Sequence, residues 1–169
     1  MDVGGRVGSN VDALAAGDGP VLDAVDRQLL ADLALNARAS NKELAAHVGV
    51  APSTCSLRMR RLRDLGVIRG FHADIDPRAL GRPIQALVAV RVQPAARAHI
   101  GALTSKLSSL PGVTNVFFLA GPVDFHIQVA VASSDDLRDF VTEHLSASRE
   151  FASTETSLIF EHRRIDRLT

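Results

Sequence analysis

The strongest constraint on the fold is a pair of short helices with almost no chain between them. Ser40 is followed three residues later by Glu43, the capping-box pattern that begins a helix. Gly49 ends that helix, because glycine adopts a positive φ angle without strain. Only two residues separate this glycine from Pro52, which suits the first turn of the next helix. Two helices joined this tightly must turn sharply against each other.

Another helix precedes this pair. Between Leu22 and Leu35, apolar residues recur at helical spacing. Asp23 is the expected N-cap, and Asp26 lies in the first turn, where an acidic side chain interacts favourably with the helix dipole. Order is therefore expected to begin at residue 22, after a glycine-rich segment, residues 1–21, that we interpret as a flexible tail.

The helix that begins at Pro52 is expected to run to about Leu65. Cys55, Met59 and Leu62 form its apolar stripe, and Ser53 or Thr54 is expected to cap its start. The extended residues on either side of Gly70, within residues 67–75, predict a small β-wing. Three helices followed by a wing predict a winged helix-turn-helix over residues 22–76.

The surface of this last helix is rich in arginine. Residues 51–70 contain five arginines and one aspartate, a local charge of about +4 in a chain whose formal net charge is zero. Because the N-terminal end of a recognition helix reaches the base edges of DNA, small hydroxyl side chains and a leucine there are candidate base readers. These candidates are Ser53, Thr54, Ser56 and Leu57, and the expected phosphate contacts are Asn41, Lys42, Arg58, Arg60 and Arg61.

An ordinary helical hairpin with a solvated arginine face is the alternative explanation of the arginine cluster alone. The capping box, the glycine turn, the proline-led helix and the wing together favour DNA binding instead. Zero net charge argues against a basic coat over the whole molecule, so the attraction for DNA is expected to reside in this helix and its wing.

The second half of the chain follows a different pattern, after a linker that we place at residues 77–83. Strict alternation of apolar residues predicts strands, and helical spacing predicts two helices. The order is βαββαβ, the ferredoxin-like arrangement, so the whole chain is expected to be α+β, with this second domain at 84–169. The expected elements are strand 84–92, helix 100–110, strand 113–119, strand 125–131, helix 134–145 and strand 154–160.

Apolar residues are expected on both faces of this sheet. Leu87, Ala89, Val116 and Phe118 alternate against the set that faces the helices. Because one small domain cannot cover both faces, self-association is expected. A dimer would place two recognition helices on one side of a duplex, so the DNA target is expected to be roughly palindromic.

No constellation for catalysis or for metal binding is evident. The chain has no phosphate-binding glycine loop and no HExxH motif, and none of its six histidines pair at i, i+4. A single cysteine, Cys55, excludes a disulfide framework and indicates a packing role in a reducing compartment. From these observations we expect a cytoplasmic protein that is not an enzyme. Because no apolar run is long enough to span a bilayer, we expect no membrane partner.

Several motifs resemble the Lrp/AsnC, or feast/famine, family of transcription regulators. The segment from Asn41 to Cys55 and the run Arg58-Met59-Arg60-Arg61-Leu62 are similar to that family's helix-turn-helix. The similarity continues through the βαββαβ half and covers residues 22–169. Leu57 and Arg63 stand where members often carry glutamate. The resemblance implies a regulator that forms dimers and octamers and responds to an amino-acid effector.

The resemblance also implies where that effector would bind. The turn at residues 120–125 is similar to the family's effector-binding turn, in which backbone groups and an aspartate contact the amino acid between dimers. Pro122 and Val123 replace the charged and aromatic residues that members usually carry there. The implied site residues are Phe118, Leu119, Gly121, Val123, Asp124, Ser134, Thr156, Ser157 and Leu158, with no cofactor or metal.

Two alternatives remain open at this point. The chain could be a DNA-organising protein without an effector, which the altered Gly-Pro-Val-Asp turn keeps possible. It could also be an amino-acid-binding allosteric module of an enzyme, which the arginine-lined helix disfavours.

Overall fold

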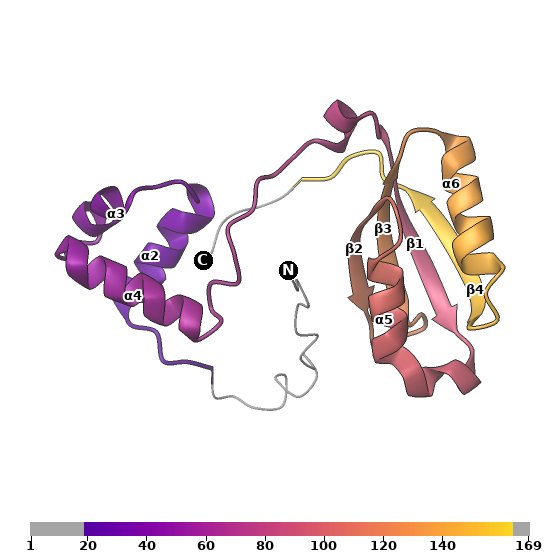
Figure 1. Cartoon of the computed structure of the whole chain (residues 1–169), viewed down its shortest axis with the longest axis horizontal. Helices are drawn as coiled ribbons and strands as arrows, with labels where there is room; N and C mark the ends of the chain where they lie inside the picture. Colours follow the sequence, from indigo (N-terminus) through magenta and orange to yellow (C-terminus); the bar gives the residue numbers. More distant parts are fainter. Residues whose placement is uncertain (1–18, 164–169) are drawn as a thin grey trace. The chain divides into compact units, whose positions relative to one another are not determined.

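The computed structural model describes residues 19–163. These residues form two compact units (Figure 1). The first comprises residues 19–74 together with Arg163, and the second spans Ile75–His162. Most of the predicted N-terminal tail and the last six residues of the predicted second domain lie outside the described residues. No helix in the described part of the chain is long and apolar enough to cross a membrane.

The first unit contains three helices, as predicted. They are α2 (Ala24–Leu35), α3 (Asn41–His47) and α4 (Pro52–Asp64). The predicted caps of the first two are confirmed: the Asp23 carboxylate accepts from the Asp26 N–H at 2.8 Å, and Ser40 Oγ accepts from the Glu43 N–H at 3.2 Å. Around them, the core consists of Leu29, Leu33, Leu44, Ala45 and Cys55, with Met59 half-buried against it.

The turn between α3 and α4 explains how closely these helices meet. Gly49 has a φ of 70°, the left-handed conformation predicted from the sequence. The Asn41 side chain donates a hydrogen bond to the Pro52 carbonyl oxygen at 2.8 Å, which ties the start of α3 to the start of α4. The predicted caps of α4 are wrong, because its N-cap is Ala51 and makes no side-chain hydrogen bond. Ser53 instead lies inside the first turn.

The predicted β-wing is also absent. Residues 67–76 contain no strand, and the backbone N–H groups of Val67 and Ile68 both donate to the Leu62 carbonyl oxygen, at 3.0 and 3.1 Å. These bonds close the C-terminal end of α4. A strand needs a partner for its N–H and C=O groups, and the segment that follows Gly70 pairs with no other strand in the described chain.

Ser40→Ala tests whether the cap of α3 stabilises the first unit. Loss of the Oγ acceptor leaves the Glu43 N–H without its partner, and we expect the free energy of unfolding to fall by about 1 kcal/mol. Urea unfolding followed by circular dichroism measures the change. Ser53→Ala is the matched control, because Ser53 caps nothing, and it should cost less than about 0.5 kcal/mol. Equal losses in the two variants would refute this assignment.

The second unit is a four-stranded antiparallel sheet with the order β2-β3-β1-β4. This confirms the predicted βαββαβ arrangement. The last strand begins at Phe151 rather than at Thr154, and the second helix continues into one π-helical turn. The elements are η1 (Pro77–Leu80), β1 (Ile84–Val92), η2 (Pro94–His99), α5 (Ile100–Ser108), β2 (Val113–Phe118), β3 (Phe125–Val131), α6 (Ser134–Phe140), η3 (Val141–Ser146) and β4 (Phe151–Leu158).

Both helices of this unit cover the same face of the sheet (Figure 1). The core between them includes Val88, Val90, Leu107, Phe125 and Ile127, all fully buried. Alternation in β1 and β3 placed these strand residues correctly, because successive side chains of a strand point to opposite faces.

The opposite face of the sheet is not covered by any helix of this unit. The prediction that Val116 and Phe118 lie on this open face is wrong. Val116 pairs with Ile127 and packs against the core, and Phe118 pairs with Phe125, with ring centroids 5.3 Å apart. Phe117, which pairs with His126, lies on the open face instead. A register shift in β2 between Val113 and Asn115 moves every later side chain to the other face. Leu87 and Ala89 lie on the open face as predicted.

Candidate nucleic-acid interface and ligand-binding turn

The exposed face of α4 carries the residues predicted to read DNA. The side chains of Ser53, Thr54 and Ser56 are exposed, and Leu57 is 66% exposed. Arg60 is exposed as well, and no ion pair or hydrogen bond engages its side chain within residues 19–163. A helix face that combines hydroxyl groups, an apolar side chain and a cation can contact both base edges and phosphates.

Further exposed cations flank this face. Arg63 lies one turn beyond Arg60 on α4, and Arg69 follows in the loop. Lys42 is exposed in the first turn of α3. Like Arg60, these three side chains engage no partner within the part of the chain that the structure describes. Sequence reasoning placed Arg63 on a flank of α4 and did not include it, or Arg69, among the site residues.

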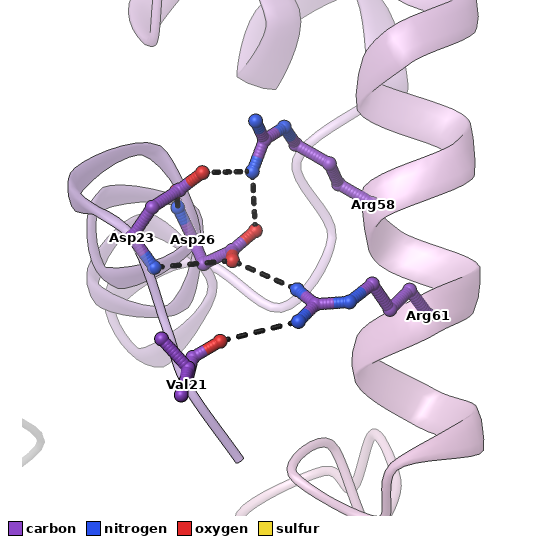
Figure 2. A network of polar contacts seen from close by, with 5 residues as sticks. All are labelled: Val21, Asp23, Asp26, Arg58 and Arg61. Carbon is purple, nitrogen blue, oxygen red and sulfur yellow. Dashed lines mark hydrogen bonds and ion pairs between the residues drawn. The ribbon is translucent and has the colours of Figure 1, made fainter.

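Arg58 and Arg61 differ from these exposed cations, because both form ion pairs. Arg58 Nη1 donates to Asp23 Oδ2 at 2.6 Å and to Asp26 Oδ1 at 2.8 Å, as Figure 2 shows. Arg61 Nη1 donates to Asp26 Oδ2 at 3.1 Å, and its Nη2 donates to the Val21 carbonyl oxygen at 3.1 Å. Both guanidinium groups are thus directed at the N-terminus of α2, so the phosphate contacts expected of Arg58 and Arg61 would compete with these internal ion pairs.

Asn41 is also engaged within the unit. Its side-chain amide donates to the Pro52 carbonyl oxygen, so its expected phosphate contact would have to use the remaining amide hydrogen. Its position at the first residue of α3 therefore serves the turn between the two helices.

The two carboxylates that bind the arginines are unequal in exposure. Asp26 is 1% exposed, whereas Asp23 is exposed at the end of α2. The Asp26 backbone N–H and the Arg58 guanidinium both lower the pKa of Asp23, and the two carboxylates in turn raise the pKa of Arg58. Sequence reasoning assigned Asp26 only to the helix dipole. Two sequence features could have indicated these ion pairs: the acidic residues at the N-cap and at the third position of α2, and the two arginines three positions apart in α4.

Low pH should reduce the stability of the first unit, because it protonates two exposed carboxylates, Asp23 and Glu43, that cap helices. The backbone N–H of Asp26 lowers the pKa of Asp23, and the backbone N–H of Ser40 lowers the pKa of Glu43, from ordinary values of 3.8 and 4.5. A carboxylate with a lower pKa in the folded state stabilises fully above its ordinary pKa, and that stability is lost as the pH falls through the folded value. We expect the protection factors of amides in α2 and α3, which compare the exchange rate with that of an unfolded chain at the same pH, to be constant near neutral pH and to fall below about pH 4.5. Higher protection factors at pH 3 than at pH 6 would contradict this.

The turn between β2 and β3 carries the second group of predicted site residues. Asp124 Oδ2 accepts a hydrogen bond from the Val92 N–H at 2.8 Å, and Asp124 Oδ1 lies 3.2 Å from Arg97 Nη2. Its side chain is 14% exposed. The Asp124 carboxylate therefore already has an internal cation and an internal donor, although each carboxylate oxygen can accept more than one hydrogen bond.

A second arginine fixes the backbone of the same turn. Arg91 donates from Nε and Nη2 to the Pro122 carbonyl oxygen, at 3.1 and 2.7 Å. The Leu119 N–H donates to the Asp124 carbonyl oxygen at 2.8 Å. Gly121 has no positive φ, and a Cβ built on it would meet no atom within 4 Å, so neither the conformation nor the packing of this chain requires glycine there.

One chain does not bring all the predicted effector residues together. Phe118, Leu119, Gly121, Val123 and Asp124 cluster at the β2–β3 turn, next to the end of β1. Thr156–Leu158 instead pair with Ala86–Val88 in the first half of β1, on the other edge of the sheet. Ser134 follows the far end of β3.

Other features of residues 19–163 provide neither a metal site nor a reactive thiol. An open cavity of about 310 Å³ lies between α6 and the ends of β2 and β3, with Asp136, Asp139 and Glu143 on its wall. Residues 19–163 contain no cluster of histidine, cysteine and acidic side chains that could hold a metal. Cys55 is fully buried, and this burial raises the pKa of its thiol, as expected for a packing residue.

Comparison with known proteins decides the family. Residues 22–63 match the AsnC-type helix-turn-helix domain, and residues 85–168 match the Lrp/AsnC ligand-binding domain. The chain belongs to the Lrp/AsnC family. It is a DNA-binding transcription regulator with a ligand-binding domain, and the relatives of this Lrp/AsnC regulator are named as transcriptional regulators, not enzymes.

Individual relatives cover nearly the same length. The regulator is 51% identical over 143 residues to the HTH-type transcriptional regulator AldR of Mycobacterium tuberculosis, which covers 85% of this chain and 80% of the relative. It is 30% identical to the regulatory protein AsnC of Escherichia coli, over 84% and 92% of the two chains.

Solved structures agree with the fold. The AldR crystal structure matches this Lrp/AsnC regulator with a TM-score of 0.72 and 46% identity, over 85% and 97% of the two chains. A transcriptional regulator of Neisseria meningitidis, solved as an L-Met complex, matches with a TM-score of 0.77 and 26% identity, over 86% and 94% of the two chains.

Proposed function

We propose that this regulator binds DNA through the exposed face of α4, with its hydroxyl side chains and Leu57 at base edges and Arg60 and Arg63 on phosphates. The observation that carries this assignment is that Arg60 and Arg63 are exposed and unengaged within the described residues, whereas Arg58 and Arg61 are ion-paired. Lys42 and Arg69 extend the basic surface on either side. Sequence-independent affinity comes mainly from such phosphate contacts.

We infer that two copies associate through the open face of the sheet. Leu87, Ala89 and Phe117 lie on that face, and Phe117 is 48% exposed. Burying these side chains against a second copy removes apolar surface from water. A dimer with two-fold symmetry would present two copies of α4 to a roughly palindromic site, and further association of dimers would give the octamer expected from the family.

We propose an amino acid as the effector, bound at the turn that contains Gly121, Val123 and Asp124. The family's ligand-binding domain and the L-Met complex of the Neisseria relative support this class of ligand. Asp124 would accept from the α-ammonium group, and backbone N–H groups would bind the carboxylate. The open space beside Gly121 suits a close approach from outside the chain.

The split between the two groups of effector residues supports a site shared by copies of the chain. The β2–β3 turn of one copy would combine with Ser134 and Thr156–Leu158 of another. An effector bound between copies favours one arrangement of the assembly, and by linkage it changes how the recognition helices engage DNA.

A ligand screen tests the effector proposal without DNA. Each of the twenty amino acids is added to the full chain, and the unfolding temperature is measured together with the assembly mass by light scattering. A ligand present at about 100 times its dissociation constant should stabilise by about 2.7 kcal/mol, a shift of several degrees. At least one amino acid should raise the unfolding temperature and shift the assembly mass. No shift with any of them would favour the alternative, a DNA-organising protein without an effector.

A further inference from the structure

Among residues 19–163, Asp26 is the only charged residue that is buried. Removing a carboxylate from water is costly unless partners replace its hydration. Here both oxygens are engaged: Oδ1 by Arg58 at 2.8 Å, and Oδ2 by Arg61 at 3.1 Å and by the Asp23 N–H at 3.3 Å. The cap of α2 alone does not require burial, since the equivalent Glu43 of α3 is exposed.

We propose that Asp26 is a positioning residue for DNA binding, which decides which arginines of α4 face the DNA. This inference rests on the proposed function of α4. Asp26 holds Arg58 and Arg61 against the N-terminus of α2, as Figure 2 shows. At 100° per residue, Arg60 and Arg63 lie on the opposite side of α4.

The distribution of arginines along α4 is what makes such a residue necessary. At 100° per residue, positions 58, 60, 61 and 63 surround most of the helix, so charge alone does not select one face for DNA. The apolar stripe of Cys55 and Leu62 specifies one side as buried, but it leaves both flanks basic. The Asp26 carboxylate, together with Asp23, neutralises the flank that carries Arg58 and Arg61, and the basic surface of α4 narrows to Arg60 and Arg63.

The contacts also fix the rotation of α4. Arg58 and Arg61 lie one turn apart, and their guanidinium groups converge on the two oxygens of a single carboxylate. Rotation of the helix by one residue position, about 100°, would break both contacts at once and leave a buried charge unpaired. Arg61 also donates to the Val21 carbonyl oxygen, which joins the chain entering α2 to the same network.

Asp26→Asn is the direct test, because it removes the charge and preserves the shape. The probes are the duplex that the unmodified full chain selects most strongly from a randomised library and a scrambled duplex of the same base composition. We expect the ratio of the two affinities to fall at least about tenfold, because Arg61 loses its only carboxylate partner and becomes available to phosphates of any sequence, while Arg58 keeps only Asp23. Asp64→Asn is the matched control: it removes an exposed charge from α4 itself and should change the ratio less than about threefold, because its repulsion from phosphates is similar on both duplexes.

Arg58→Gln and Arg60→Gln form a second, independent test, two positions apart on the same helix and each removing one positive charge. The slope of log affinity against log salt should stay unchanged in Arg58→Gln and should become shallower by about 0.9 per bound helix in Arg60→Gln. Arg58→Gln should nevertheless lower the affinity ratio, because it breaks one of the two ion pairs by which Asp26 holds α4.

The outcomes separate this inference from the proposed function. An unchanged affinity ratio in folded Asp26→Asn, or slopes equally shallow in both arginine variants, overturns the positioning role and leaves DNA binding by α4 intact. If Asp26→Asn does not fold, the arginine pair alone decides the inference. An unchanged slope in Arg60→Gln refutes phosphate binding by α4, and the positioning role then fails with it.

Discussion

Replacing both Arg60 and Arg63 by alanine should reduce DNA affinity on the order of 10²–10³-fold at physiological salt when a dimer binds. Each helix loses two phosphate contacts, so the dimer loses four, and each contact contributes about 0.9 to the slope of log affinity against log salt. The loss should be similar on selected and scrambled duplexes, because phosphates carry no sequence information.

The fold of this variant should be unaffected. Both side chains are exposed, and neither engages a partner within residues 19–163, so circular dichroism and the unfolding midpoint should match those of the unmodified chain. Arg27→Ala combined with Arg149→Ala removes the same charge from exposed positions outside α4. This control should bind DNA within a fewfold of the unmodified chain, and a loss equal to that of the Arg60 and Arg63 variant would mean that net charge, not α4, determines affinity.

Asp124→Asn should abolish the effect of an amino-acid effector on DNA binding, an effect typically between about 5-fold and 150-fold. The asparagine keeps an oxygen that can accept from the Val92 N–H, so the end of β1 stays tied to the turn. It lacks the negative charge that the α-ammonium group needs. DNA affinity without effector should be unchanged.

Arg97→Gln should have the opposite effect on effector binding to Asp124→Asn. Arg97 is the internal cation on Asp124, so its removal should strengthen the binding of an α-ammonium group at that carboxylate. Arg97→Gln should therefore lower the effector concentration for a half-maximal response, whereas Asp124→Asn should give no response. An Asp124→Asn chain that responds normally would place the effector site elsewhere in the ligand-binding domain.

Local sequence signals predicted the helices and most strands, because their causes are local. The Ser40 and Glu43 capping box, Gly49 at positive φ and the alternation in β1 each depend on a few neighbouring residues. The predicted wing around Gly70 failed, because a strand depends on a distant partner that no local pattern reveals.

The errors in the sheet and in the candidate site have similar causes. A register shift in β2 exchanged the faces of Phe117 and Phe118, and alternation cannot foresee an extra residue in a strand. Helical spacing correctly placed Arg58 and Arg61 on one flank of α4. It could not show that the N-terminus of α2 covers that flank, so the ion pairs of both arginines with Asp26 were not predicted.

The most direct test of the central claim is the affinity of the unmodified regulator for its selected duplex, measured by fluorescence anisotropy with each amino acid in turn. The account predicts that at least one amino acid changes this affinity by about fivefold or more, in either direction. It also predicts that Asp124→Asn removes that change and that Arg60→Ala with Arg63→Ala lowers the affinity itself on the order of 10²–10³-fold. Unchanged affinity with all twenty amino acids would contradict an effector-responsive regulator, and full affinity without Arg60 and Arg63 would contradict DNA binding through α4.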